Sequence, residues 1–200
     1  MAHCIGLTLI RHLPTVGNQR RQYIGWTDEP IIREPDKNHT LPWQPKTVYG
    51  SDLRRCKESA ALYFPKAAYE SNAGFRESHF GEWEGKTYDV LKDNQTYRSW
   101  IDHPAIEKPP GGESLLEVRN RVLTALSGLP EEVNDYFVVT HGGPIRLLLT
   151  EFSPEEQDFW SWTIPHGSVW RLEWENRDDF REGKQCKSLS AVPITGNAPM

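Results

Sequence analysis

The chain has 200 residues and a mass of 23.0 kDa, enough for one domain with a sizeable buried core. Its 8 Trp, 7 Tyr and 7 Phe exclude an intrinsically disordered chain, because disordered segments are poor in aromatic residues. The net charge of −5 at pH 7 argues against a general nucleic-acid binder, which would carry a basic face. We therefore expect a globular protein with no nucleic-acid partner.

The cysteines and the apolar runs bear on the cellular compartment. Cys4, Cys56 and Cys186 are far apart and form no CxxC pair, which argues against a disulfide framework and against a zinc ribbon. The N-terminus lacks the basic and long apolar regions of a signal peptide. No apolar run approaches the roughly 18 residues that span a bilayer. The sequence therefore predicts a cytoplasmic protein with reduced thiols and no membrane partner.

The first half of the chain alternates between strand and helix signals. Cys4–Ile10 is a short apolar run typical of a buried strand. The segment 27–46 contains four prolines and is expected to be a long irregular loop. Leu53–Phe64 places apolar side chains on one face of a helix. Three further elements are expected here: a strand at Thr47–Tyr49, a strand at 66–70 and interrupted helix at 86–103.

The second half continues the same alternation. Ser114–Leu126 has a capping box, with Ser114 followed by Glu117, and an apolar stripe, so it is the clearest helix. Four further elements are expected: a buried strand at Tyr136–Thr140, a helix at 143–151, a short helix capped by Ser153 with Pro154 in its first turn, and a strand at Ser168–Trp174. Residues 188–200 are expected to form a loose tail. The alternation predicts an α/β domain with a mainly parallel sheet.

Two histidines follow two of the predicted strands. Arg11 and His12 end the first strand, and His141 ends the strand at Tyr136–Thr140, directly before Gly142. In open α/β sheets, ligands bind beyond the carboxyl ends of the strands. A single histidine there is more often a hydrogen-bonded structural residue, but two of them, one beside an arginine and one beside a Gly-Gly turn, favour a shared site.

Phosphoryl transfer is the chemistry that suits these side chains. A neutral imidazole is a good nucleophile and can carry a phosphoryl group. Nearby cations would lower the pKa of His12 and keep it neutral. Arginine binds phosphate oxygens through its planar fork and stays charged. The N–H groups of Gly142 and Gly143, at a helix start, would add anion donors.

Five segments, in order, resemble the motifs of the histidine phosphatase (phosphoglycerate mutase-like) superfamily. The first runs from Leu9 to Asn18 and resembles its Arg-His-x-x-Thr-x-x-Asn motif. The others are Ser51–Cys56, Phe75–Gly85, Pro110–Ser114 and Val138–Gly143. Together they span about residues 5–150, and five motifs in register are far more specific than any one. The resemblance implies a three-layer α/β/α domain over 1–200, with a small cap-like insertion at about 78–112.

The resemblance also assigns roles to single residues. It implies that His12 is the nucleophile that becomes phosphohistidine and that Glu77 is the general acid and later the base. It places Arg11, Arg55 and His141 around the phosphate. Asn18, Thr15 and the backbone of Gly142 would add contacts. No metal and no cofactor are expected, because arginines would supply the positive charge that Mg²⁺ supplies elsewhere.

Several alternatives remain open from the sequence alone. Arg54 neighbours Arg55 and is favoured as a solvated surface charge. Glu82, and then Glu84, compete with Glu77 for the acid role. His79 and His166 are candidates for the pocket rim, whereas no function is expected for His3, His39 and His103. Cys56 is expected in the core. Four loop tryptophans could line the pocket but are more often core residues: Trp26, Trp43, Trp83 and Trp100.

The chain also departs from the family pattern. Leu13 and Pro14 stand where many members have Gly-Glu, which removes a carboxylate beside the pocket. The segment between Pro30 and Ser51 is short and proline-rich where many members have a helix. The flank of the sheet it leaves could be covered by Trp43 or by a partner subunit, which makes a homodimer an open alternative. The insertion between Glu77 and His141 is smaller than in the glycolytic mutases, which favours a phosphatase.

Four function classes are compared. The first is a phosphomonoesterase acting on a small-molecule phosphate ester, similar to α-ribazole phosphatases or to broad-specificity enzymes. The second is a phosphoglycerate mutase, which would yield isomerised phosphoglycerate instead of free phosphate. A metal-dependent hydrolase is disfavoured because HxH and HExxH spacings are absent from the sequence. A silent binding module is disfavoured because nucleophile, acid and phosphate ligands are all present.

Overall fold

The computed structural model describes residues 4–33 and 40–193. Its centre is a six-stranded sheet in the order β3-β2-β4-β1-β5-β6. The strands are β1 (Ile5–Arg11), β2 (Thr47–Gly50), β3 (Ala68–Ser71), β4 (Asp135–Thr140), β5 (Val169–Trp174) and β6 (Ser188–Val192). The first four along the sheet pair in parallel, whereas β5 and β6 are antiparallel to their neighbours. The predicted mainly parallel sheet is confirmed.

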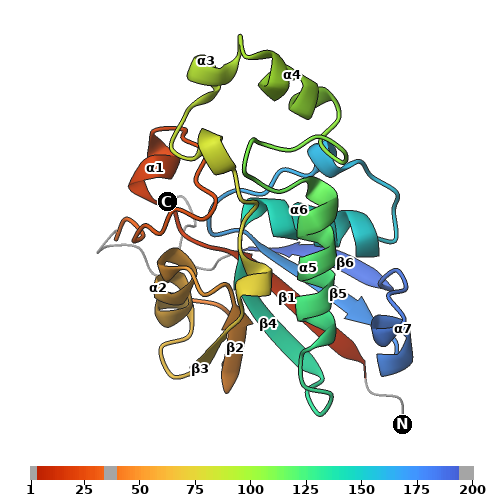
Figure 1. Ribbon diagram of the computed structural model, residues 1–200. Coiled ribbons are helices and arrows are strands. Elements are labelled where there is room, and N and C mark those ends of the chain that lie inside the picture. Colours follow the sequence, from red (N-terminus) through yellow and green to blue (C-terminus); the bar gives the residue numbers. More distant parts are fainter. Residues whose placement is uncertain (1–3, 34–39, 194–200) are drawn as a thin grey trace.

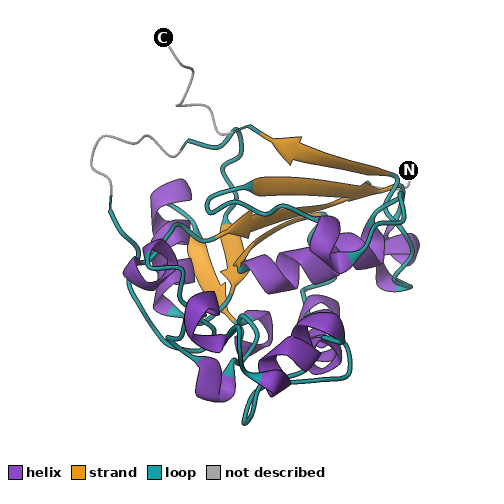
Figure 2. Cartoon of the chain, turned by 90° about the horizontal axis from the view of Figure 1, so that it is seen from above, coloured by secondary structure: helices purple, strands orange, loops and turns teal. Residues whose placement is uncertain are grey.

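Helices lie on either side of this sheet (Figure 2). On one face, Leu7 and Leu9 of β1 share a core with α5 (Leu115–Ser127), α6 (Gly142–Phe152) and α7 (Arg177–Arg181). On the other face, Ile10 packs in a second core with α2 (Arg54–Tyr63). Successive strand residues point to opposite faces, so β1 serves both cores, and its residues from Ile5 to Ile10 are all buried. The result is the expected three-layer α/β/α arrangement.

The helix α5 forms where its capping box and apolar stripe predict it. The Ser114 side chain accepts the N–H of Glu117 at 3.2 Å, and the Glu117 carboxylate accepts the N–H of Ser114 at 2.8 Å. These two bonds satisfy N–H groups that a helix start leaves without partners. Val118 and Val122 are completely buried against the sheet. Each such side chain contributes about 1.5–3 kcal/mol of hydrophobic free energy.

A small separate layer stands beyond the carboxyl ends of the parallel strands. It consists of η2 (Gly81–Trp83), α3 (Tyr88–Leu91) and α4 (Gln95–Asp102), seen at the top of Figure 1. These elements have a core of their own, formed by Trp83, Leu91, Tyr97 and Trp100. Two of the four loop tryptophans are therefore core residues of this segment, which we call the cap. It lies over the carboxyl ends of β1 and β4, where the predicted site is located.

Several elements differ from the sequence expectations. The expected loose tail begins as a strand, β6, which pairs with β5, whereas 194–200 lie outside the described residues. No helix follows Ser153, because its hydroxyl accepts the N–H of Glu155 at 3.1 Å and closes a turn instead. The next element is the 3₁₀ turn η3 (Phe159–Ser161). The short helices α1 (Val16–Gln19) and α7, and the 3₁₀ turn η1 (Ala73–Phe75), were not predicted.

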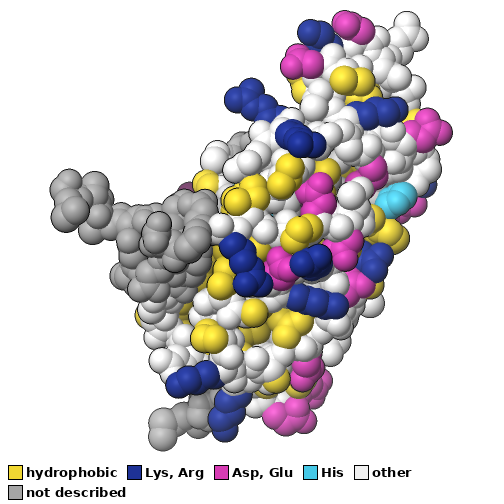
Figure 3. Space-filling model, turned by 90° about the vertical axis from the view of Figure 1, so that its left-hand side faces the viewer, with side chains coloured by type: hydrophobic (Ala, Val, Ile, Leu, Met, Phe, Trp, Pro, Cys, Tyr) yellow, Lys and Arg dark blue, Asp and Glu magenta, His cyan; other side chains and the backbone are white. Residues whose placement is uncertain are grey.

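The proline-rich stretch between α1 and β2 is irregular wherever it is described. It contains neither helix nor strand at 27–33 and 40–46. Trp43 packs against Phe137 of β4 with ring centroids 5.7 Å apart, so this side chain covers part of the flank. On the face shown in Figure 3, basic and acidic side chains are interspersed. In the described part of the chain, no helix has the length and apolarity to span a membrane.

Candidate active site

The two predicted histidines meet at the carboxyl ends of the two central strands, β1 and β4. β1 lies parallel to β4 with Arg11 opposite Thr140, so His12 and His141 leave neighbouring strands side by side. The N–H of His12 still donates to the carbonyl of Thr140 at 3.0 Å. The two imidazole rings have centroids 5.0 Å apart. The strand pattern therefore predicted this juxtaposition correctly.

His12 is buried and held in one orientation. Its Nδ1 lies 2.7 Å from the carbonyl oxygen of Leu13, which requires a proton on Nδ1 and leaves the Nε2 lone pair available. Burial, reinforced by Arg55 and Arg11, lowers the pKa of His12 well below its ordinary value. The imidazole is therefore neutral near pH 7. This is the state that a nitrogen nucleophile needs.

His166 lies on the other side of His12. The two rings have centroids 5.1 Å apart, and Nδ1 of His166 is 3.3 Å from the backbone oxygen of His12. Burial and then Arg11 lower the pKa of His166 to about 4. His166 thus lies beside His12, and its place at the pocket rim stays a prediction. His79, by contrast, contacts the Trp26 ring at 4.6 Å and places Nδ1 2.9 Å from the carbonyl of Gly111.

Arg11 lies against the start of α6. Its Nη1 donates to the carbonyl of Ile164, and burial lowers its pKa to about 10 although Glu77 opposes this shift. A Cβ atom at Gly142 would lie 3.2 Å from the guanidinium carbon of Arg11. A Cβ atom at Gly143 would lie 2.2 Å from a carboxylate oxygen of Glu77. The two glycines thus let an arginine and a glutamate approach one helix start.

Arg55, rather than Arg54, enters the site. It is completely buried at the start of α2 and donates through Nη2 to the carbonyl of Gly25 at 2.6 Å and through Nη1 to that of Thr27 at 2.8 Å. Its Nε donates to Nδ1 of His141 at 3.3 Å. Arg54 is exposed and pairs with Glu58, as expected of a surface charge. Among the described residues, no carboxylate forms an ion pair with Arg55, so its charge stays available to an anion.

Both ring nitrogens of His141 face protein groups. Nδ1 accepts from Arg55, and Nε2 lies 3.5 Å from the Cys56 sulfur. Burial and then Arg55 lower the pKa of His141 well below its ordinary value. Burial raises the pKa of the Cys56 thiol to about 12, so the thiol is protonated. Cys56 is a core residue, as predicted, but its contact with His141 was not foreseen.

Glu77 is the carboxylate that lies next to the arginines and α6. Its Oε2 accepts the N–H of Gly143 at 3.1 Å, and Oε1 accepts that of Ser78 at 3.0 Å. Glu82 is exposed, and the structure gives its side chain no hydrogen bond among the described residues. The Glu84 carboxylate instead accepts hydrogen bonds from the backbone N–H groups of Gly25 and Trp26. Of the three glutamates, Glu77 is therefore the one whose carboxylate lies at the start of α6 and interacts electrostatically with Arg11.

Asn18 and Thr15 form the cap of α1. The Oδ1 of Asn18 accepts the Thr15 N–H at 3.1 Å and its hydroxyl at 3.0 Å. The hydroxyl of Thr15 in turn accepts the N–H of Asn18 at 3.3 Å. The Asn18 side-chain NH₂ has no hydrogen bond among the described residues, whereas Thr15 is fully buried. Thr15 is therefore placed to orient Asn18 and has no free hydroxyl for a phosphate.

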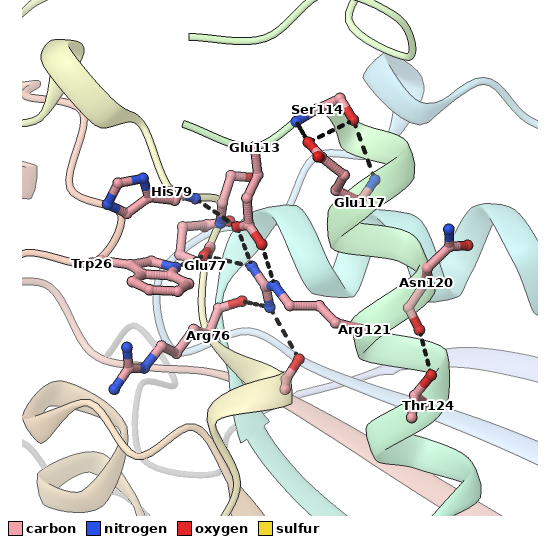
Figure 4. Close-up of polar contacts among 12 residues, drawn as sticks. Trp26, Arg76, Glu77, His79, Glu113, Ser114, Glu117, Asn120, Arg121 and Thr124 are labelled. Atoms are coloured by element: carbon pink, nitrogen blue, oxygen red, sulfur yellow. Dashed lines mark hydrogen bonds and ion pairs between the residues drawn. The ribbon is translucent and has the colours of Figure 1, made fainter. Parts of the chain in front are cut away.

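An arginine of α5 that the sequence reasoning missed holds the backbone around Glu77 (Figure 4). Arg121 donates to the carbonyls of Gly74, Arg76 and Glu77 at 3.0, 2.7 and 2.8 Å. It also makes a two-pronged ion pair with Glu113, with both N···O distances 2.8 Å. All five N–H donors of the guanidinium are thereby used. The available signal was an arginine beside the buried stripe of α5, eight residues after Glu113.

Trp26 completes the surroundings of Glu77. Its Nε1 donates to the Glu77 carbonyl at 2.9 Å. The indole lies between His79 and the guanidinium of Arg76, which is 4.7 Å from the ring centroid (Figure 4). The indole ring therefore packs beside Glu77, the predicted acid, and keeps His79 and Arg76 apart. Within the described ranges, no three His, Cys, Asp or Glu side chains gather in a way that could hold a metal ion.

The chain is similar to known proteins over most of its length. The sequence profile of the histidine phosphatase superfamily (branch 1) matches residues 7–182. Phosphoglycerate mutase-like protein 4 of Arabidopsis thaliana is 27% identical over 171 residues, which cover 74% of this chain and 71% of that protein. Probable phosphoglycerate mutase GpmB of Serratia proteamaculans is 28% identical over 155 residues, covering 71% and 72%.

Two solved structures illustrate the shared fold. Phosphoglycerate mutase from Thermus thermophilus superimposes with a TM-score of 0.69 at 28% identity, covering 94% of this chain and all of that one (100%). The alpha-ribazole phosphatase from Shigella flexneri has a TM-score of 0.74 at 22% identity, covering 84% and 90%. The profile match spans most of the chain and includes every site residue described above. The chain thus belongs to the histidine phosphatase superfamily, branch 1.

Proposed function

We propose that this protein is a phosphomonoesterase that hydrolyses small-molecule phosphate esters through a phosphohistidine at His12. The observation that carries the proposal is the buried imidazole of His12, whose Nδ1 is held by the Leu13 carbonyl and whose pKa is lowered by burial and by the guanidinium groups of Arg55 and Arg11. The carboxylate of Glu77 lies at the same helix start. Nucleophile, anion-binding groups and acid are thus brought together by four separate chain segments.

The first half-reaction breaks the ester bond. Arg11 and Arg55 bind the phosphate oxygens, and the free NH₂ of Asn18 and the start of α6 add donors. Nε2 of His12 attacks phosphorus, the P–O bond to the leaving group breaks, and Glu77 gives its proton to the leaving oxygen. The bond from Nδ1–H of His12 to the Leu13 carbonyl stabilises the positive charge that develops on the ring.

The second half-reaction restores the enzyme. Glu77, now a carboxylate, takes a proton from a water molecule whose oxygen attacks phosphorus. The P–N bond breaks, its electron pair returns to Nε2, and inorganic phosphate leaves. A role for His141 as donor to the phosphoryl group stays a prediction, because its nitrogens face Arg55 and Cys56. Its contact with Arg55 supports a part in orienting that guanidinium.

A phosphoglycerate mutase is the alternative that the names of the relatives favour. Both reactions would share the phosphohistidine but differ in the acceptor, which is water in a phosphatase and a second hydroxyl group in a mutase. The short cap, with only α3, α4 and η2, supports water as the acceptor, because a mutase must close its site against water. Release of free phosphate versus isomerised phosphoglycerate distinguishes the two.

The decisive experiment is to trap the phosphoenzyme. We expect that rapid quenching during turnover of a generic phosphate ester yields one acid-labile phosphohistidine, located by mass spectrometry on the peptide containing His12. The variant His12→Ala should form none, whereas His103→Ala, which alters an exposed histidine at the end of α4, should label as the wild type does. Turnover by the wild type with no trapped intermediate would contradict the mechanism.

A further inference from the structure

The carboxylate of Glu84 anchors the loop Gly25–Thr27, which lies beside the proposed phosphate site. Glu84 accepts the N–H groups of three successive residues, Gly25, Trp26 and Thr27, at 3.1, 2.9 and 3.3 Å. It also accepts the Thr27 hydroxyl at 2.7 Å and the N–H of Phe80 at 3.1 Å. Among the described residues, Glu84 forms no salt bridge. Its negative charge is therefore stabilised by backbone and hydroxyl donors alone.

The opposite side of the same loop faces a cation. The carbonyls of Gly25 and Thr27 accept the buried guanidinium of Arg55 at 2.6 and 2.8 Å. The N–H groups of the loop thus donate to the Glu84 carboxylate, and two of its carbonyls accept from the Arg55 guanidinium. The carbonyl of Gly25 and the N–H of Trp26 belong to one peptide unit, so Arg55 and Glu84 polarise that unit in the same direction and strengthen each other's hydrogen bond.

From this arrangement we propose that Glu84 is a positioning residue that holds Arg55 in its phosphate-binding place through the Gly25–Thr27 loop. The inference rests on the proposed phosphate-binding role of Arg55. A carboxylate in direct contact with Arg55 would compete with phosphate for the same N–H donors. Glu84 instead balances the buried positive charge through intervening peptide units, and the guanidinium keeps its remaining donors for the substrate.

Two further observations support an ionised, tightly fitted Glu84. Burial alone would raise its pKa, but the hydrogen bonds from Thr27, Trp26, Phe80 and Gly25 outweigh burial and hold the pKa below its ordinary value. The loop is also packed closely against its neighbours, with no room for a side chain at Gly25. A Cβ atom on Gly25 would lie 2.1 Å from the Ser78 carbonyl oxygen and 2.4 Å from Oε1 of Glu84.

The loop also reaches the proposed acid. Trp26, whose N–H binds Glu84, donates its indole N–H to the carbonyl of Glu77. One anchored loop therefore sets the spacing between the guanidinium that binds the phosphate and the residue that protonates the leaving group. Glu84, a candidate acid from sequence alone, thereby gains a separate role that acts through backbone and not through contact with substrate.

The test measures binding of orthovanadate and inorganic phosphate, which needs no turnover. Glu84→Gln replaces one acceptor oxygen by an NH₂ group that confronts N–H donors, so the loop loses its anchor. We expect the dissociation constants for orthovanadate and for phosphate to rise by about tenfold, equivalent to about 1.4 kcal/mol. The matched control is Glu82→Gln, which makes the same charge change on an exposed side chain and should leave both constants unchanged.

A positioning role also predicts how two changes combine. In an Arg55→Lys background, where the carbonyls of Gly25 and Thr27 have lost their planar partner, Glu84→Gln should weaken vanadate binding little further. Full additivity of the two changes would overturn the proposal. So would an unchanged vanadate constant in Glu84→Gln alone. Failure of the wild type to form a phosphohistidine would instead contradict the proposed function, and the two failures are thereby distinguished.

A milder variant covers the case in which Glu84→Gln does not fold. Thr27→Val removes only the hydroxyl that donates to Glu84 and leaves all backbone donors in place. We expect vanadate binding to weaken by about threefold with the thermal midpoint close to that of the wild type. Wild-type affinity for vanadate in a folded Thr27→Val protein would count against the loop as the route from Glu84 to Arg55.

Discussion

The carboxylate of Glu77 lies against the first turn of α6, where its Oε2 accepts the N–H of Gly143 at 3.1 Å. The other oxygen of this carboxylate occupies the place that a side chain at position 143 would need. A glycine is thus required here by a neighbour that is distant in sequence. The proposed acid and the anion-binding helix start form one unit.

Replacing that glycine should displace the acid. Gly143→Ala would put Cβ at 2.2 Å from Oε1 of Glu77, so the carboxylate must move away from α6. We expect turnover of esters with poor leaving groups to fall by about 100-fold, the effect typical of a lost general acid. The control Gly128→Ala adds a Cβ with only ordinary contacts, the nearest at 3.5 Å, and should leave the rate unchanged. Equal rates for the two variants would contradict the placement of Glu77.

The acid role of Glu77 has a signature in the choice of substrate. Glu77→Gln cannot give a proton to the leaving oxygen, so alkyl phosphates should slow by about 100-fold or more, whereas an activated ester such as p-nitrophenyl phosphate should slow far less. Rates across a series of leaving groups measure this as a steeper dependence on leaving-group pKa. Glu82→Gln serves as the comparison. If it, rather than Glu77→Gln, steepens the dependence, the acid has been misplaced.

The Arg121–Glu113 pair should contribute to the free energy of unfolding. The two side chains are only 20% and 19% exposed, and Arg121 uses every donor on Glu113 and three carbonyls. Arg121→Lys cannot replace these bonds and should lower the free energy of unfolding by about 2 kcal/mol. Denaturant unfolding measures this change. The exposed pair Lys108–Glu117 is the reference, and Lys108→Met should cost less than about 1 kcal/mol.

The buried histidines make stability depend on pH. His12, His141 and His166 all have a pKa that is lower in the folded protein than the ordinary 6.5, about 4 for His166. Below pH 6.5 the unfolded chain therefore binds more protons than the folded one. Each such histidine lowers the unfolding free energy by up to about 1.4 kcal/mol per pH unit as pH falls, until the folded pKa is reached.

Denaturant midpoints between about pH 7 and about pH 4.5 test this linkage. We expect the full stability above about pH 7 and a steady fall below about pH 6.5. His166→Asn should reduce the slope, because one of the three proton-binding groups is then absent. Gly128→Ala, which changes no titratable group, should keep the wild-type slope. A pH-independent midpoint over this range would show that the three imidazoles are not held neutral.

Much of the fold was predictable because its signals are local. The apolar runs of β1 and β4 and the capping box at Ser114 each need only neighbouring residues. The edge strand β6 was missed because Ser188–Val192 is partly exposed and has little apolar pattern. Its pairing with β5 comes from the tertiary fold. The wrong helix at Ser153 reflects a side chain that favours turns as readily as helix starts.

From the sequence, the site could be predicted only for residues whose side-chain type and position match a motif. The motif register selected Arg55 over Arg54 and Glu77 over Glu82, and the structure places the two selected residues at His141 and α6. The part played by Glu84 could not be read in advance. Its partners are N–H groups of a loop that is distant in sequence, and backbone N–H groups leave no trace in a sequence.

The position of β1 has a consequence for how the molecule fluctuates. The strand that ends in Arg11 is paired on both sides, with β4 and β5, whereas the cap has a small aromatic core of its own. Backbone amides of β1 should therefore exchange with deuterium only through global unfolding, while those of α3 and α4 exchange through cheaper local opening. The cap can then loosen to admit and release ligands on a fast timescale while the proposed nucleophile, His12, stays beside the slowest-opening part of the protein.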